Sequence, residues 1–135
     1  KMDKQGIVLA IVGSRDFDDI EYMRACIPII SSQYDIKSIV SGGARGADTL
    51  SEQIAKDLNI SYKHFHADWT KFGKSAGFLR NRDIVEACDV VAAFPLGESR
   101  GTKDTIKQAK KANKQVFVWE KSKDVILPSI LDLLV

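Results

Sequence analysis

Three short segments of this sequence have the composition of anion-binding loops. They read GSR at 13–15, SGGARGAD at 41–48 and SRGT at 99–102. Each follows an apolar run and precedes a segment of helical periodicity. Glycine at a helix start costs about 1 kcal/mol relative to alanine, but it leaves the free N–H groups of the first turn open to a phosphate. Arginine and serine add side-chain donors.

The pattern therefore predicts a phosphate site. It does not match either of two well-known phosphate-binding motifs. The segments lack the GxGxxG spacing of a dinucleotide-binding loop and the GK[ST] ending of a P-loop. ATP hydrolysis of the P-loop type is disfavoured for that reason. The alternative is a set of ordinary glycine turns, and three similar loops at one edge of a sheet would favour the phosphate site over that alternative.

The candidate ligand-binding residues lie in these loops or in the segment after residue 67. They are Gly13, Ser14, Arg15, Ser41, Gly42, Gly43, Arg45, Gly46, Asp48, Asp68, Trp69, Lys74, Ser99, Arg100, Gly101 and Thr102. The helix around RNRDIVEA adds Arg80 or Arg82, which lie two apart and so cannot point the same way; their spacing does not decide between them.

Several of these residues have a structural explanation as well as a functional one. Arg15 could contact a phosphate or an adenine ring, or pair with a nearby aspartate on the surface. Asp48 could accept ribose hydroxyls or orient Arg45, or be a favourable charge in a first helical turn. Thr102 could cap its helix, bind phosphate, or do both. Trp69 could stack on a base or cover the edge of the core.

The two histidines, His64 and His66, alternate onto one face of a predicted strand. No carboxylate or cysteine completes a metal site at suitable spacing, so we expect no metal. The lysines from 103 to 114 are read as a solvated helix face, because no aromatic residue is interleaved with them to stack on bases.

Composition restricts the class of protein. The 135 residues correspond to one domain, with 44% apolar residues and a net charge of +2 from 20 basic and 18 acidic residues. So small a basic excess leads us not to expect nucleic acid as a partner. No apolar run approaches the length of a membrane span, and Cys26 and Cys88 are expected to be reduced core residues of a cytoplasmic protein.

Apolar runs and helical periodicities alternate along the chain. Strands are predicted at 7–12, 36–40, 61–67, 90–94 and 116–119, and helices from 18 or 19 toward 33, at 47–58, around RNRDIVEA, at 102–112 and after Pro128. Asp18 and Glu21 have capping-box spacing. Pro28 should kink or break the first helix, and Leu50, Ile54 and Leu58 should form the buried stripe of the second.

This alternation predicts an α/β fold with a Rossmann-like, doubly wound parallel sheet of five strands in the order 3-2-1-4-5, covered by helices on both faces. We expect a single domain over 1–135, with a tail at 1–5 and a C-terminal extension at 120–135 that packs on the core or forms a dimer interface. The switch in strand order would bring the loops after strands one, two and four together, at the usual ligand position of such sheets.

Four stretches carry a family resemblance: VGSRDF (12–17), IVSGGARGADTLSEQIA (39–55), ADWTKFGKSAGFLRNRDIV (67–85) and SRGTKDTIKQAKK (99–111). Together they resemble the SLOG superfamily, specifically its YspA or cpYpsA-related branch, over about residues 7–119. SGGARGADTLSE and RNRDIV are similar to segments of the DNA-processing protein A family, and FPLGESRGTKDTI is similar to a loop of LOG phosphoribohydrolases. The resemblance implies a Rossmann-like domain that binds nucleotides or nucleotide-derived signals, and it supports Arg80 with Asn81 as site residues.

One departure bears on activity. LOG enzymes carry a glutamate in the motif GTxxE, and Thr105 occupies that position here. Asp48, Glu98 and Asp104 are the remaining candidates for a catalytic carboxylate.

We therefore expect binding of a small nucleotide or nucleotide-derived signal, such as ADP-ribose, a cyclic relative, NAD or a nucleoside phosphate, by a sensor or sequestering protein. No cofactor is required, and a homodimer or higher oligomer is expected. The alternative is a LOG-like hydrolase of an N-ribosyl bond. Single-stranded DNA binding is the weaker alternative.

Overall fold

The computed structural model describes residues 3–42 and 45–120. Its core is a five-stranded sheet in the order β3-β2-β1-β4-β5, with every neighbouring pair parallel. The predicted fold class and strand order are confirmed. The C-terminal extension predicted at 120–135 lies almost entirely outside the described residues.

The elements follow one another in the predicted alternation. The strands are β1 (Gln5–Gly13), β2 (Tyr34–Ser41), β3 (Ser61–His64), β4 (Val90–Phe94) and β5 (Gln115–Val118). The helices are α1 (Ile20–Ser31), α2 (Ala47–Leu58), α3 (Trp69–Phe72), the 3-10 turn η1 (Gly73–Ser75), α4 (Ala76–Ala87) and α5 (Arg100–Lys111). None of the helices in the described ranges combines the length and the apolar content needed to cross a bilayer.

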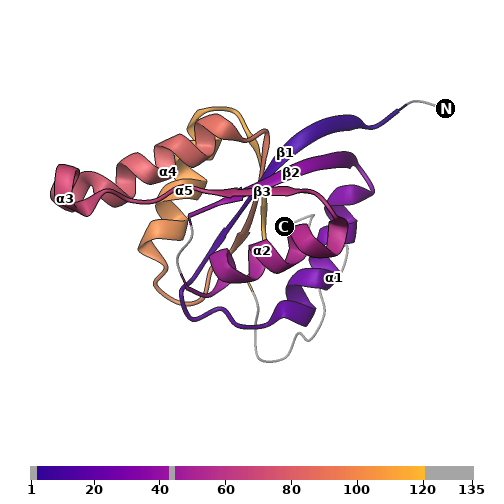
Figure 1. Ribbon diagram of the computed structural model, residues 1–135, viewed down its shortest axis with the longest axis horizontal. Coiled ribbons are helices and arrows are strands. Elements are labelled where there is room, and N and C mark those ends of the chain that lie inside the picture. Colours follow the sequence, from indigo (N-terminus) through magenta and orange to yellow (C-terminus); the bar gives the residue numbers. More distant parts are fainter. Residues whose placement is uncertain (1–2, 43–44, 121–135) are drawn as a thin grey trace.

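The side chains of β1 divide the core into two layers. Ile7, Leu9 and Ile11 point into a cluster with α1 and α2, whereas Ala10 and Val12 point into a cluster with α4 and α5. Alternation along a strand produces this division, and burial on both faces explains why β1 is an unbroken apolar run. Figure 1 shows the result, with α1 and α2 on one side of the sheet and α4 and α5 on the other.

The sheet register aligns the ends of the strands that carry the predicted loops. Gly13, the last residue of β1, pairs with Phe94, the last residue of β4, and Ser41 at the end of β2 pairs with His64 at the end of β3. Because all strands are parallel, the loops that follow them leave the sheet at one edge. This is the edge at which the strand order reverses around β1.

The helix α1 differs from its predicted form. Asp19, not Asp18, is the N-cap, and its carboxylate accepts from the Tyr22 N–H at 3.0 Å. The helix continues through Pro28 to Ser31, so the predicted break into two pieces does not occur. The Pro28 side chain is exposed, and one missing N–H in the last turn is tolerated because apolar packing of Met23, Cys26 and Ile30 holds the helix on the sheet.

Two other predictions of extent are corrected. β3 ends at His64 instead of continuing to residue 67, since only Ser61 to His64 pair with β2. Of the predicted buried stripe of α2 only Ile54 is fully buried, because Leu50 is partly exposed and Leu58, in the last turn, is 41% exposed.

Gly46 fixes the distance between the loop after β1 and the start of α2. Its φ is +79°, and a Cβ built on it would lie 2.3 Å from the Ser14 carbonyl oxygen. The Ala47 N–H donates to that same oxygen at 3.3 Å. Only glycine combines this backbone conformation with so close an approach of a second chain segment.

We expect Gly46→Ala to lower the free energy of unfolding by about 2 kcal/mol more than Gly73→Ala. The two glycines have nearly the same backbone, φ +79° and ψ −131° against φ +56° and ψ −132°. They differ in surroundings, since nothing lies within 4 Å of a Cβ at Gly73. Urea unfolding of both variants measures the difference, and equal losses would contradict the proposed contact.

Candidate functional site

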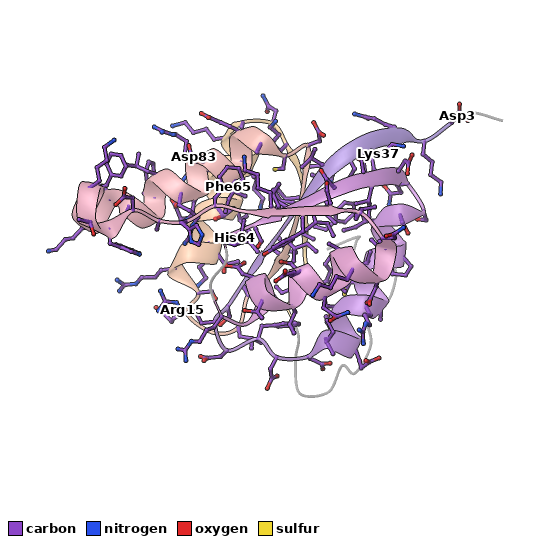
Figure 2. All side chains as sticks on the ribbon, viewed as in Figure 1. Asp3, Arg15, Lys37, His64, Phe65 and Asp83 are labelled. Atoms are coloured by element: carbon purple, nitrogen blue, oxygen red, sulfur yellow. The ribbon has the colours of Figure 1, made fainter. Side chains whose placement is uncertain are left out.

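A pocket of about 340 Å³ opens where β1 and β4 end. It is lined from four elements and from loops next to them: the end of β1, the start of α2, the middle of α4 and the start of α5. Its lining residues are Val12, Gly13, Ser14, Arg15, Asp16, Gly42, Asp48, Arg80, Asn81, Ile84, Glu98, Ser99, Arg100, Gly101, Thr102 and Thr105. Figure 2 shows the labelled Arg15 on the side of the molecule where the strands end.

The loop after β1 is held by its own backbone and by one aromatic anchor. The Ser14 N–H donates to the Phe94 carbonyl at 3.1 Å, and the Phe17 N–H donates to the Ser14 carbonyl at 3.1 Å. Phe17 is buried, with its ring centroid 5.2 Å from that of Phe94. This turn leaves Arg15 exposed at the pocket while the residues on both sides of it are fixed.

The start of α2 is not the open anion site that the glycines of SGGARGAD predicted. The first amide of the helix, on Ala47, already donates to the Ser14 carbonyl. Gly46 serves this contact between protein segments, and a Cβ on Gly42 would lie 2.9 Å from the Arg80 guanidinium. Gly43 lies outside the described residues. The first amide of α2 is therefore closed to a phosphate by the protein itself, and Gly46 serves that contact, whereas the ligand role of Gly42 stays a prediction.

Arg80 of α4 reaches across the pocket to the loop after β2. Its Nη1 donates to the Gly42 carbonyl at 3.0 Å, and its Nε donates to Asn81 Oδ1 at 3.0 Å. Burial lowers the pKa of Arg80 below its usual value; the carboxylate of Asp48 opposes this shift and the positive charge of Arg15 adds to it. Two cations thus act on each other at this pocket, and an anion between them would relieve that repulsion.

Asn81 connects α4 to the first turn of α5. Its Nδ2 donates to the Gly101 carbonyl at 3.2 Å and to Asp104 Oδ2 at 2.9 Å, while its Oδ1 accepts from Arg80. The side chain is only 5% exposed. A single buried amide thus holds both a pocket cation and the start of a helix, with its donors and acceptor satisfied.

The first turn of α5 carries the unoccupied donors of the pocket. The N-cap is Ser99, whose side chain caps no N–H of the helix. Among the described residues, no acceptor is found for the N–H groups of Gly101 and Thr102. Both residues line the pocket, and nothing lies within 4 Å of a Cβ built on Gly101. These amides and the positive end of the helix dipole make α5 the helix start at which an anion can bind.

The comparisons with known proteins identify the first half of this fold. Residues 7–72 match the family model YAcAr, described as the YspA, cpYpsA-related SLOG family. These residues, just under half of the chain, are similar to that family. The resemblance drawn from the sequence motifs is confirmed.

One curated relative of the SLOG segment is the Gene 61 protein of Mycobacterium phage D29. It is 44% identical over 80 residues, which cover 55% of this chain and 64% of that protein. The match thus spans less than two thirds of the relative.

Two solved structures share this fold. DNA processing protein A from Streptococcus pneumoniae superposes with a TM-score of 0.68 at 20% identity, covering 90% of this chain and 52% of that one. DNA processing protein A from Helicobacter pylori superposes with a TM-score of 0.63 at 19% identity, covering 87% of this chain and 67% of that one. The second structure is described as showing a single-stranded DNA binding mode.

This likeness corrects the expectation that nucleic acid would not be a partner. A domain of the same fold belongs to a protein that binds single-stranded DNA. Net charge was a poor criterion, because +2 averaged over the whole chain says nothing of how cations are placed on one face.

Most of the predicted site residues are brought together by the fold. Eleven of them line the pocket: Gly13, Ser14, Arg15, Gly42, Asp48, Arg80, Asn81, Ser99, Arg100, Gly101 and Thr102. Ser41 does not, because its hydroxyl is buried against the Tyr62 hydroxyl on the α2 side of the sheet. Arg45 is exposed outside the pocket.

The segment after β3 lies apart from the pocket. Asp68 is the N-cap of α3 and accepts from the Lys71 N–H at 3.0 Å. Trp69 is 56% exposed and so does not cover the core edge, and Lys74 is exposed in η1. Figure 1 shows α3 at one end of the molecule, beyond the sheet. Helix α4 places Arg80 at the pocket, whereas the arm formed by α3, η1 and the start of α4 lies away from the pocket.

The three candidate carboxylates have different surroundings. Asp48 is 7% exposed and lines the pocket, and Glu98 lies exposed on its rim. Asp104 is outside the lining and accepts from both Asn81 and Gln108. Thr105, at the LOG glutamate position, lines the pocket with its hydroxyl donating to the Gly101 carbonyl at 3.1 Å.

Sequence reasoning did not assign a site role to four lining residues: Val12, Asp16, Ile84 and Thr105. Asp16 directly follows Arg15 and could have been found by its place in the loop. Val12 and Ile84 are buried apolar residues of the core that also form the pocket floor, and nothing in their type distinguishes them from other core residues.

We expect Asn81→Ala to lower the free energy of unfolding by about 2–3 kcal/mol, because it leaves buried partners on α4 and α5 without their hydrogen bonds. Arg82→Ala is the control at the adjacent exposed position and should change stability by less than about 0.5 kcal/mol. Chemical denaturation compares the two. An Asn81→Ala loss as small as that of the control would show that the amide does not hold the two helices.

Proposed function

We propose that this protein binds a small nucleotide, with its phosphate against the first turn of α5 and the guanidinium groups of Arg15 and Arg80. The observation that supports this most strongly is the pair of unused N–H groups on Gly101 and Thr102 in the pocket that Arg15 and Arg80 also line. Donors fixed before the ligand arrives need no rearrangement to bind an anion.

The charges around the pocket favour a ribonucleotide over a bare phosphate. Three arginines line it, and so do three carboxylates, Asp16, Asp48 and Glu98. A site for inorganic phosphate would gain nothing from carboxylates near the anion. A nucleotide carries hydroxyls beside its phosphate, and acidic residues accept hydrogen bonds from ribose hydroxyls in other folds of this type.

The volume of the pocket limits the size of the ligand. At about 340 Å³ it lies at the small end of the range for ligand pockets, roughly 300–1,000 Å³. A nucleoside phosphate matches that space better than a complete dinucleotide. A larger ligand such as ADP-ribose would extend past the rim formed by Glu98 and Arg100.

Binding is favoured over hydrolysis by the groups nearest α5. Thr105 cannot act as a carboxylate, and Asp104 is committed to Asn81 and Gln108. Asp48 remains as a buried carboxylate beside Arg80. Incubation with AMP, NAD and ADP-ribose followed by chromatography distinguishes the activities: intact ligand supports binding, whereas product that disappears in Asp48→Asn would establish a hydrolase.

We expect Arg15→Gln and Arg80→Gln each to weaken AMP binding about 10-fold or more, since each removes a charge-assisted contact to phosphate. Arg82→Gln is the matched control, because Arg82 lies on the same helix, is exposed and pairs with Asp83 at 3.6 Å. Isothermal titration calorimetry measures all three. Unchanged affinity in Arg15→Gln and Arg80→Gln would place the ligand elsewhere.

A second candidate is single-stranded DNA binding, and one observation favours it. The arm of α3, η1 and the start of α4 exposes three aromatic side chains, Trp69 at 56%, Phe72 at 43% and Phe78 at 54%. The Nζ of Lys71 lies 5.1 Å from the centroid of the Phe72 ring. Exposed aromatics interleaved with lysines provide stacking surfaces and backbone contacts for a single strand.

Fluorescence anisotropy with a labelled oligothymidylate at several salt concentrations tests this second candidate. Affinity that falls steeply with salt and is lost in Trp69→Ala but kept in Arg15→Gln would assign the strand to the arm. AMP bound in the pocket should respond in the opposite way. Its affinity should be the same for Trp69→Ala as for the unaltered protein, and lower for Arg15→Gln.

A further inference from the structure

The two histidines of the chain meet at the end of β3. Their Nε2 atoms are 2.7 Å apart, and their rings stand edge to face at 87° with centroids 4.2 Å apart. Both side chains are exposed. Figure 2 shows His64 on the same side of the molecule as Arg15.

Spacing in the sequence led us to expect no metal here, but from the geometry of the two rings we propose that His64 and His66 bind a divalent transition-metal ion, of the class of Zn²⁺, Ni²⁺ or Cu²⁺, through these two nitrogens. Imidazole nitrogen is the ligand that such borderline cations prefer. In the structure the two nitrogens share a hydrogen bond, so one of them presents a lone pair and the other a proton. On metal binding the donor ring takes its other neutral tautomer, with the proton on Nδ1, so that each Nε2 offers a lone pair to the ion.

The geometry requires little movement. Two imidazole nitrogens on one tetrahedral Zn²⁺, each bonded at about 2.0–2.1 Å, lie about 3.3 Å apart. The observed 2.7 Å separation must therefore widen by only about 0.6 Å. Exposed rings can turn by that amount, and the backbone is held because the Phe65 N–H, between the two histidines, donates to the Ser41 carbonyl at 2.8 Å.

Protein atoms would fill only part of the coordination shell. No group of three or more His, Cys, Asp or Glu side chains within metal-binding reach occurs among residues 3–42 and 45–120. Water would complete the shell, as it does at metal sites that keep open positions. The ion would thus lie at the same sheet edge as the pocket, one strand beyond β2, with positions free for an oxygen ligand.

The chain offers a clean test because competing ligands are few. The sequence has two histidines in all, so any imidazole ligation comes from this pair. Cys26 and Cys88 are buried, and burial raises the pKa of the Cys88 thiol to about 11, so it stays protonated at neutral pH and cannot act as a thiolate ligand.

Titration of the protein with ZnCl₂ and with NiCl₂, followed by calorimetry and by imidazole NMR resonances, tests the proposal. We expect one ion per chain, perturbation of both imidazole spectra, and an affinity about 10-fold or more weaker in His64→Gln and in His66→Gln. Binding that survives both substitutions, or the absence of saturable binding by either metal, would overturn the proposal.

Asp68→Ser supplies the matched control. It removes the carboxylate two residues after His66 but keeps a side-chain oxygen to cap α3, so the helix should remain. Retained metal binding in this variant supports ligation by the two imidazoles. Loss of binding there, with binding kept in His64→Gln, would assign the ion to the carboxylate and contradict the proposal.

Discussion

The buried amide of Asn81 is the contact on which the pocket depends. It accepts from Arg80 and donates to the Gly101 carbonyl and to Asp104, so one side chain fixes a cation on α4 and the helix start of α5 relative to each other. Both groups face the same space. A buried amide can do this only if all its partners are present, because an unsatisfied polar group in the interior is costly.

The two helix starts nearest the pocket have different roles, although their sequences look alike. At α2 the first amide is occupied by the Ser14 carbonyl, and Gly46 permits that close approach. At α5 the N–H groups of Gly101 and Thr102 find no acceptor among the described residues. Glycine in the first loop therefore serves the packing of protein against protein, and glycine in the second leaves space beside the helix.

Much of the fold was predictable because it depends on patterns spread over many residues. Unbroken apolar runs identified β1 and β4 as doubly buried strands, and their alternation with helices gave the strand order. The site was predictable down to the loops, since the ends of parallel strands must meet at one edge. What could not be predicted was which donors stay free: that depends on one contact, Ser14 with Ala47, between segments more than thirty residues apart.

Charge shows the same limit of sequence reasoning. The total of +2 suggested a surface without affinity for nucleic acid, yet the fold is shared with a protein that binds single-stranded DNA. The aromatic side chains in and near α3 are exposed because this helix lies beyond the sheet. A helix of four residues is too short for its sequence periodicity to indicate which side chains are exposed. Local arrangement decides such partners, and total charge does not.

The uncapped first turn of α5 links occupancy of the pocket to the stability of the whole domain. An anion seated there would supply the acceptors that Ser99 does not, so it would complete the helix as a capping side chain does. Whatever binds the native state alone also stabilises it, by RT ln(1 + [L]/Kd). The melting temperature of this domain should therefore report the concentration of its own ligand, which makes heat resistance in a crude extract a way to search for that molecule.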